Sequence, residues 1–259
     1  MFIRAVVMTV MVSLVAPVAW AETIAKTYPV KDFTEFVTGG NTSVEISQDG
    51  TEYLRVEADA EVMKRVKVDQ SGKRVSVWVK SDSNFFNWFG DNDDPVRITL
   101  HVKQLEYLEL SGGAYAKLGD LQGEKFQLNA SGAGNANFAT LNAKILKMEL
   151  SGAANARIEN VNSQEQDFGL SGASNVDIKS ASNTQELDVD ASGASNFRGK
   201  NLTTKQAHLE ASGASHIEAA VTETLDANAS GASSVEYYGN PKARTDASGA
   251  SHVNAHTIE

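Results

Sequence analysis

Acidic side chains recur at alternate positions in the second half of the chain, with a spacing that suits acid–base catalysis or the binding of a cation. Two carboxylates held about 5–10 Å apart can act as acid and base on a glycosidic bond. Crowded carboxylates can also hold a cation or a basic partner, because like charges about 5 Å apart repel by about 1 kcal/mol per pair even in water. A solvated face that resists pairing with other molecules is the plainer interpretation. The residues concerned are Asp188, Asp190, Glu210 and Asp226.

An aromatic segment is the second candidate site. The stretch from Ser81 to Pro95 reads SDSNFFNWFGDNDDP and interrupts two strand-like segments. Four aromatic side chains within five positions are costly to leave in water, so they either pack on neighbouring strands or form a contact site for a partner or a glycan. They are Phe85, Phe86, Trp88 and Phe89.

A repeat must position these side chains. Ser-Gly pairs begin at residues 111, 131, 151, 171, 192, 212, 230 and 248, at intervals of 20, 20, 20, 21, 20, 18 and 18 residues. Apolar and polar residues alternate before and after each pair, which is the pattern of β-strands. A period of this length indicates a solenoid. We therefore predict a right-handed parallel β-helix of about eight coils, each with three inward-facing patches separated by two or three turns.

The Ser-Gly motif itself is expected at a corner of each coil. Glycine accepts backbone angles that a Cβ would obstruct, and identical corners stacked along the axis leave room only for small side chains. A short serine hydroxyl can also bond a nearby backbone group in the turn. Stacking further predicts columns of equivalent residues.

One column lies four residues after each Ser of the motif. Stacked asparagine amides can bond along the axis as they do in cross-β ladders, and the alternative is a row that binds a ligand. The two histidines of this column lie two coils, or about 10 Å, apart, too far for an easy shared zinc. No metal and no cofactor are therefore expected. The column includes Asn135, Asn155, Asn175, Asn196, His216 and His252.

The N-terminus predicts export. Arg4 precedes an uncharged apolar run and the small-x-small sequence Ala19-Trp20-Ala21, so residues 1–21 read as a cleaved signal peptide. No later segment is long enough to span a membrane. The net charge of −10 disfavours nucleic acid and anionic lipid as partners. Cysteine is absent from the sequence, which excludes disulfides.

Residues 22–104 lack the motif but alternate strongly. We expect a β-rich N-terminal capping subdomain there, with a short helix at residues 60–65, and the parallel β-helix at residues 105–259. Such a cap would cover the edge of the first coil.

The sequence also resembles a known family. The segments VKDFTEFVTGGNTSVEISQDGTEYLRVEADAEVMKRVKV and VRITLHVKQLEYLELSGGAYAKL, followed by units such as SGASNVDI and SGASHIEA, are similar to the head GIN domain family of bacterial proteins known as auto-transporter adhesins. The resemblance covers nearly all of the chain after residue 21. It implies a secreted or periplasmic β-helix and brings no catalytic residues.

Together these features predict an exported, non-enzymatic, adhesin-like protein of the cell envelope, periplasmic or extracellular, that binds carbohydrate or an envelope protein. Two alternatives stay open. One is a structural scaffold that self-associates through the edge of the last coil, residues 248–259. The other is a polysaccharide-active enzyme, although uniform coils without long loops build no asymmetric cleft.

Overall fold

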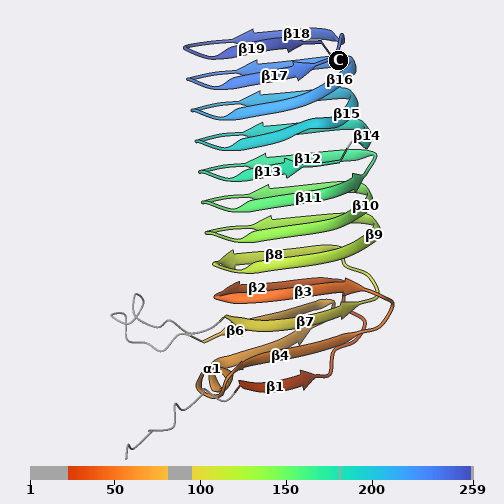
Figure 1. Cartoon of the computed structure of the whole chain (residues 1–259), viewed down its shortest axis with the longest axis vertical. Coiled ribbons are helices and arrows are strands. Elements are labelled where there is room, and N and C mark those ends of the chain that lie inside the picture. The colour runs from red at the N-terminus through yellow and green to blue at the C-terminus, as the bar shows by residue number, and fades with distance from the viewer. Residues whose placement is uncertain (1–22, 81–94, 181, 258–259) are drawn as a thin grey trace, which may run out of the picture.

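The alternating segments form a nearly all-β solenoid of about seven turns (Figure 1). The computed structural model describes residues 23–80, 95–180 and 182–257. The predicted fold class is confirmed, with slightly fewer turns than expected. The signal peptide and the aromatic segment with Phe85, Phe86, Trp88 and Phe89 lie outside the described residues.

Parallel strands in register build the body of the rod. Most strand residues pair with their counterparts one coil away, as Asn135 does with Asn155 and Asp188 with His208, and the register shifts between residues 199 and 206. The stacked positions expected from the repeat are therefore present. The strands are β8 (Tyr107–Gly112), β9 (Tyr115–Ala130), β10 (Asn135–Leu150), β11 (Asn155–Asn162), β12 (Glu165–Leu170), β13 (Asn175–Ile178), β14 (Ser182–Ala191), β15 (Asn196–Ala211), β16 (His216–Ala229), β17 (Ser234–Tyr238), β18 (Lys242–Ala247) and β19 (His252–His256).

Within a coil the buried side chains fall into three groups, as predicted, but the turns are fewer. β9 runs through 16 residues without a break. Its buried positions are Ala116 and Leu118, then Leu121, then the group from Phe126 to Ala130. Four exposed residues between Leu121 and Phe126 let the strand bend while its ladder to the next coil continues. In this coil the Ser-Gly corner forms the tight turn.

The glycine of each corner has a positive φ, such as 75° at Gly172. A Cβ built there would lie 2.5 Å from the carbonyl oxygen of Gly152, one coil below. From Ser174 to Ser233 the corners carry a second, buried serine that bonds backbone: the Ser215 Oγ donates to the carbonyl oxygens of Ser212 and Ala191 at 2.9 and 3.0 Å. Both features match the reasons for the motif given above.

Parallel stacking continues below residue 105. β2 (Glu35–Gly40) pairs with β8 above it and with β6 (Arg74–Val79) below, and β3 (Thr42–Gln48) lies between β9 and β7 (Val96–Val102). The chain order of these layers thus differs from their spatial order. The division at residue 104 stays a prediction, and one hydrophobic core runs from Phe33 to Val235.

Antiparallel strands close the N-terminal end. β1 (Thr23–Tyr28) pairs with β4 (Tyr53–Asp59), β4 pairs with β7, and β5 (Val66–Ser71) pairs with β6. The predicted short helix is present as α1 (Ala60–Arg65), where the Asp59 carboxylate accepts a hydrogen bond from the Glu61 amide.

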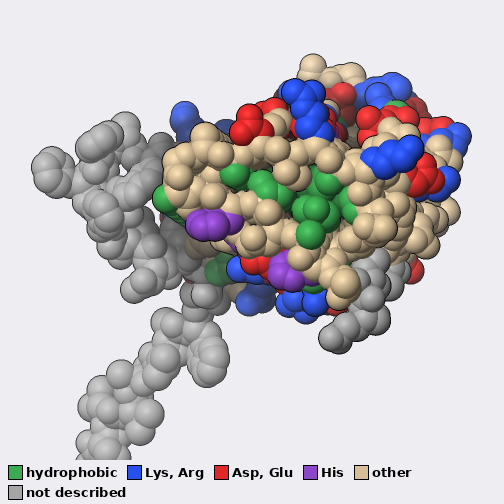
Figure 2. All heavy atoms as spheres, turned by 90° about the horizontal axis from the view of Figure 1, so that it is seen from above, with side chains coloured by type: hydrophobic (Ala, Val, Ile, Leu, Met, Phe, Trp, Pro, Cys, Tyr) green, Lys and Arg blue, Asp and Glu red, His purple; other side chains and the backbone are tan. Residues whose placement is uncertain are grey.

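The other end differs, because every residue of β18 is exposed and β19 is mostly exposed. Figure 2 looks onto this end and shows apolar side chains at its centre, surrounded by polar and charged ones. The described residues include no helix of the length and apolar character needed to cross a membrane.

Candidate functional site

A groove runs along the outer face of the strands that precede the Ser-Gly corners. Its floor comes from residues two positions before each corner and its rim from the corner serines, on β8, β9, β10, β12, β14, β15, β16 and β18. Its volume is about 1040 Å³. Alternation places these side chains outward, and the constant register lines them up along the axis. Its carboxylates are Glu109, Glu149, Asp167, Asp188, Asp190, Glu210 and Asp246.

The N-terminal half of the groove is partly neutralised by Lys147. The ammonium Nζ of Lys147 lies 2.7 Å from Asp167 Oδ2 and 3.0 Å from Glu149 Oε1. Hydrogen bonds to Asp167 and then to Glu149 raise the pKa of Lys147 well above its ordinary value. Glu109 accepts a hydrogen bond of 2.8 Å from the Tyr107 hydroxyl. One lysine thus offsets part of the charge of the three carboxylates in this half.

The next coils present uncompensated acid. In the described part of the chain, no lysine or arginine forms an ion pair with Asp188 or Asp190, and Asp188 Oδ1 is buried without a hydrogen-bond partner. Burial raises the pKa of both carboxyls, and neighbouring carboxylates raise it further: Asp190 acts first on Asp188, and Glu210 first on Asp190. His208 Nε2, 3.2 Å from Glu210 Oε1, is the adjacent imidazole. The groove is thus built to receive positive charge or hydrogen-bond donors here.

The asparagine column forms a ladder on the strand after the corner. Asn155 donates through Nδ2 to Asn135 Oδ1 at 2.9 Å, Asn175 donates to Asn155 at 2.9 Å, and Asn196 donates to Asn175 at 2.8 Å. Each amide therefore joins two coils, so its acceptor and donor capacity is largely used within the protein. This supports a structural part for these residues.

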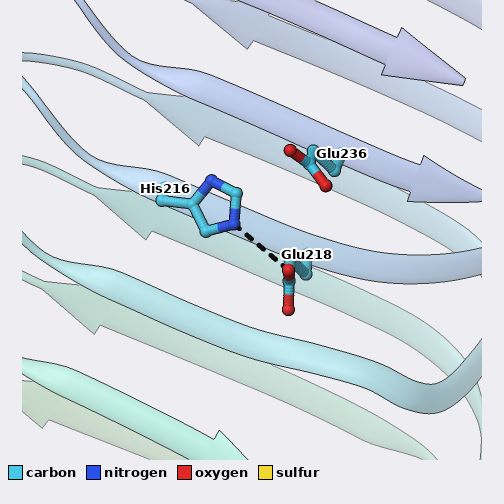
Figure 3. A group of neighbouring side chains, drawn as sticks. All are labelled: His216, Glu218 and Glu236. Atoms are coloured by element: carbon cyan, nitrogen blue, oxygen red, sulfur yellow. Dashed lines mark ion pairs between the residues drawn. The ribbon is translucent and has the colours of Figure 1, made fainter.

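The ladder changes character at His216, the next member of the column. Its Nε2 lies 3.3 Å from Glu218 Oε1, two residues along β16. Glu236 on β17 stands in register with Glu218, and potential ligand atoms of the three side chains all lie within 4.8 Å of one another (Figure 3). All three side chains are half-buried. The imidazole and two carboxylates form a compact cluster on one outer face.

The sequence of the chain matches a known protein family. Residues 32–241 match the model of the family described as "Putative auto-transporter adhesin, head GIN domain". The chain belongs to this family. No curated protein matches it at a significant level.

Solved structures share the fold of this head GIN domain protein. A "putative adhesin" from Parabacteroides distasonis superposes with a TM-score of 0.81 at 17% identity, covering 92% of this chain and 98% of that one. A "putative adhesin" from Parabacteroides merdae gives 0.78 at 16% identity, with coverages of 91% and 96%. A "putative lipid binding protein" from Parabacteroides distasonis gives 0.76 at 18%, with coverages of 90% and 96%. At such identities the likeness concerns the fold, and the protein is adhesin-like by family.

The structure places the sequence-predicted acidic residues of this head GIN domain protein in two settings. Asp188, Asp190 and Glu210 line the groove together. Asp226 is not among the residues that line it and stands in register with His208 and Arg244. Three of the four candidate carboxylates thus share one surface.

The prediction of no metal site is based on the distance between two histidines of one column, His216 and His252. His252 stands in register with Ser234 and, as expected, is separated from His216 by one coil. The carboxylates beside His216 come instead from two residues along the strand and from the following coil. The signal for this cluster is His216-x-Glu218 followed by Glu236 one local period of 18 residues later.

Proposed function

We propose that this head GIN domain protein is an exported, non-enzymatic, adhesin-like protein that binds an extended basic segment of another envelope protein in its acidic groove. The observation that supports this most is the Asp188 and Asp190 pair, whose carboxyls are partly buried beside other carboxylates without a lysine or arginine partner among the described residues. Charges held in this way favour a cationic ligand over water alone. Export rests on the signal sequence predicted at residues 1–21.

The groove suits a polymer better than a small molecule. Its lining runs from β8 to β18, so successive coils at about 4.8 Å spacing repeat similar groups over a length of roughly 34 Å. An extended peptide advances about 3.3 Å per residue and can therefore contact several coils. The uniform coils supply no enclosed cleft for acid and base catalysis on a sugar.

Peptide binding to the mature chain tests the proposal. A fluorescent lysine-rich decapeptide is titrated at low salt against wild type and against Asp188→Asn with Asp190→Asn. Removing two charges should weaken binding by about tenfold or more, since each contact contributes about 1 kcal/mol. Asp120→Asn, an exposed carboxylate of β9 outside the groove, should leave the affinity unchanged.

Two results would contradict the proposal. The first is equal peptide affinity for wild type and the double variant. The second is a neutral oligosaccharide that binds in the groove more tightly than the peptide and loses affinity in the same variant, which would make the ligand a glycan. Substitution of Phe85, Phe86 and Trp88 by Ala in the same assay tests whether the aromatic segment contributes a contact.

Self-association is the second candidate, and the exposed end of the rod favours it. β18 and β19 present an unpaired strand edge and the apolar surface seen in Figure 2. Such edges pair readily with another chain unless they are covered. Sedimentation that shows one monomeric species at all concentrations would remove this candidate.

A further inference from the structure

We infer that His216, Glu218 and Glu236 bind a divalent transition-metal ion such as Zn²⁺, with water completing the coordination, and that this ion ties β16 to β17. The inference is independent of the proposed ligand of the groove, because the cluster lies on the strand after the corner and the groove on the strand before it. The argument rests on the ligand types, their spacing and their registration.

The ligand types suit zinc. Imidazole nitrogen and carboxylate oxygen are both common zinc ligands, and a mixed set of these donors favours a transition metal over Ca²⁺ or Mg²⁺, which take oxygen donors. The ligand atoms of His216, Glu218 and Glu236 lie within 4.8 Å of one another. Tetrahedral zinc with bonds of about 2.1 Å places its ligands about 3.4 Å apart. Small rotations of three partly exposed side chains can close that difference.

The fold produces this spacing. His216 and Glu218 are two residues apart on β16, so both point to the same outer face. Glu236 stands directly beside Glu218 on β17, one coil further along. These positions form a triangle with sides set by the strand repeat and the coil spacing. Figure 3 shows the three side chains on this one face.

His256 of the following coil contacts Glu236 but lies outside the ligand cluster. His256 Nε2 lies 3.6 Å from Glu236 Oε2. Its backbone stands in register with Tyr238, two residues beyond Glu236, and its ring stacks on Tyr238 with centroids 4.9 Å apart. Four strand positions and two coils, or about 16 Å of backbone, separate His256 from His216, so the two imidazoles do not share the ion. Arg198 stands in register with Glu218 on the opposite side from Glu236, so it does not lie between the proposed ligands.

Two carboxylates of the cluster stand side by side. Glu218 and Glu236 are in register on neighbouring coils, where like charges about 5 Å apart repel. A divalent cation compensates both and uses the imidazole lone pair as well. It would join β16 and β17, which belong to successive coils near the exposed end of the rod.

Metal titration of the chelator-treated protein tests the inference. Co²⁺ binding is followed by the visible absorption of the bound ion, and Zn²⁺ is added as a competitor. We expect one equivalent to bind, with an affinity at least about tenfold lower in each of His216→Ala, Glu218→Gln and Glu236→Gln, which corresponds to 1.4 kcal/mol or more. Zn²⁺ should also raise the thermal midpoint of wild type more than that of these variants.

His208→Ala is the matched control. His208 and Glu210 form a pair of the same spacing, with Nε2 and Oε1 3.2 Å apart, but within the described residues they belong to no cluster of three ligands. Its metal affinity should equal that of wild type. Far-ultraviolet circular dichroism without metal verifies that each variant is folded. Failure of wild type to bind one equivalent, or undiminished binding in His216→Ala, Glu218→Gln or Glu236→Gln, would overturn the site.

Discussion

The corner glycines offer the sharpest test of the stacked architecture, through Gly193→Ala. Gly193 has a φ of 76°, and a left-handed backbone costs alanine about 1–2 kcal/mol more than glycine. The added Cβ would also lie 2.5 Å from the carbonyl oxygen of Gly172 and 3.1 Å from its amide nitrogen. These atoms are backbone and can yield only if two coils separate, so an overpacking cost of about 1–3 kcal/mol is added. The expected loss of stability is about 2–5 kcal/mol.

Gly40→Ala is the matched comparison because Gly40 belongs to the same corner column and has a φ of 78°. A Cβ built on Gly40 meets nothing within 4 Å. This variant should therefore lose only the backbone contribution of about 1–2 kcal/mol. The free energies of unfolding are measured by urea titration with two probes, to verify that each solenoid unfolds in one transition. If Gly193→Ala lost no more stability than Gly40→Ala, close backbone stacking at the corner would be refuted.

Three further predictions concern the ladder, the groove and the core. Asn175→Ala removes a hydrogen bond to Asn155 and one from Asn196, and it should cost about 1–3 kcal/mol in urea unfolding; no loss would show that the ladder is not stabilising. Burial and neighbouring carboxylates raise the pKa of Asp188 and Asp190 in the native state, so the native state holds these protons more tightly and stability falls as pH rises from the ordinary value of 3.8 through the raised value. Asp188→Asn with Asp190→Asn should then raise the urea midpoint at pH 7 and change it little at pH 3, and the reverse order would contradict the pKa directions. Phe197→Ala opens the core beside Phe168, 4.9 Å away between ring centroids, and should cost about 3–5 kcal/mol by thermal or urea unfolding.

The repeated part of the fold could be predicted because each repeat carries the same alternation of apolar and polar residues and the same Ser-Gly motif. Alternation identifies inward and outward positions, and the Ser-Gly interval fixes which residues stack. The small insertion at the 21-residue interval before Ser192 is absorbed without loss of register, since Asp167 still pairs with Asp188. Sequence could not show that β9 would continue unbroken past Leu121, because exposed polar residues suit a bend as well as a turn.

The N-terminal layers could not be ordered from sequence. β2 and β3 lie between the layer of β6 and β7 and the layer of β8 and β9. No motif in residues 22–104 marks which strand pairs with which, and apolar alternation alone is equally satisfied by parallel and antiparallel neighbours. The pairing is settled by long-range packing around side chains such as Phe36, Ile46 and Leu100, all of which are fully buried.

The sites follow from how the columns vary. In a column of identical residues, such as the asparagine ladder, the side chains hydrogen-bond to one another, so few donors and acceptors remain for a ligand. A binding site can form where the residue type in a column changes. The new side chain does not continue the hydrogen-bonded ladder along the axis and instead contacts neighbours on its own strand. His216 follows Asn196 in the ladder and contacts Glu218 instead. Glu218 and Glu236 lie two positions along the strand from the column of His216. A comparison of residues within one column therefore does not bring the three together, whereas the three-dimensional stacking of the coils does.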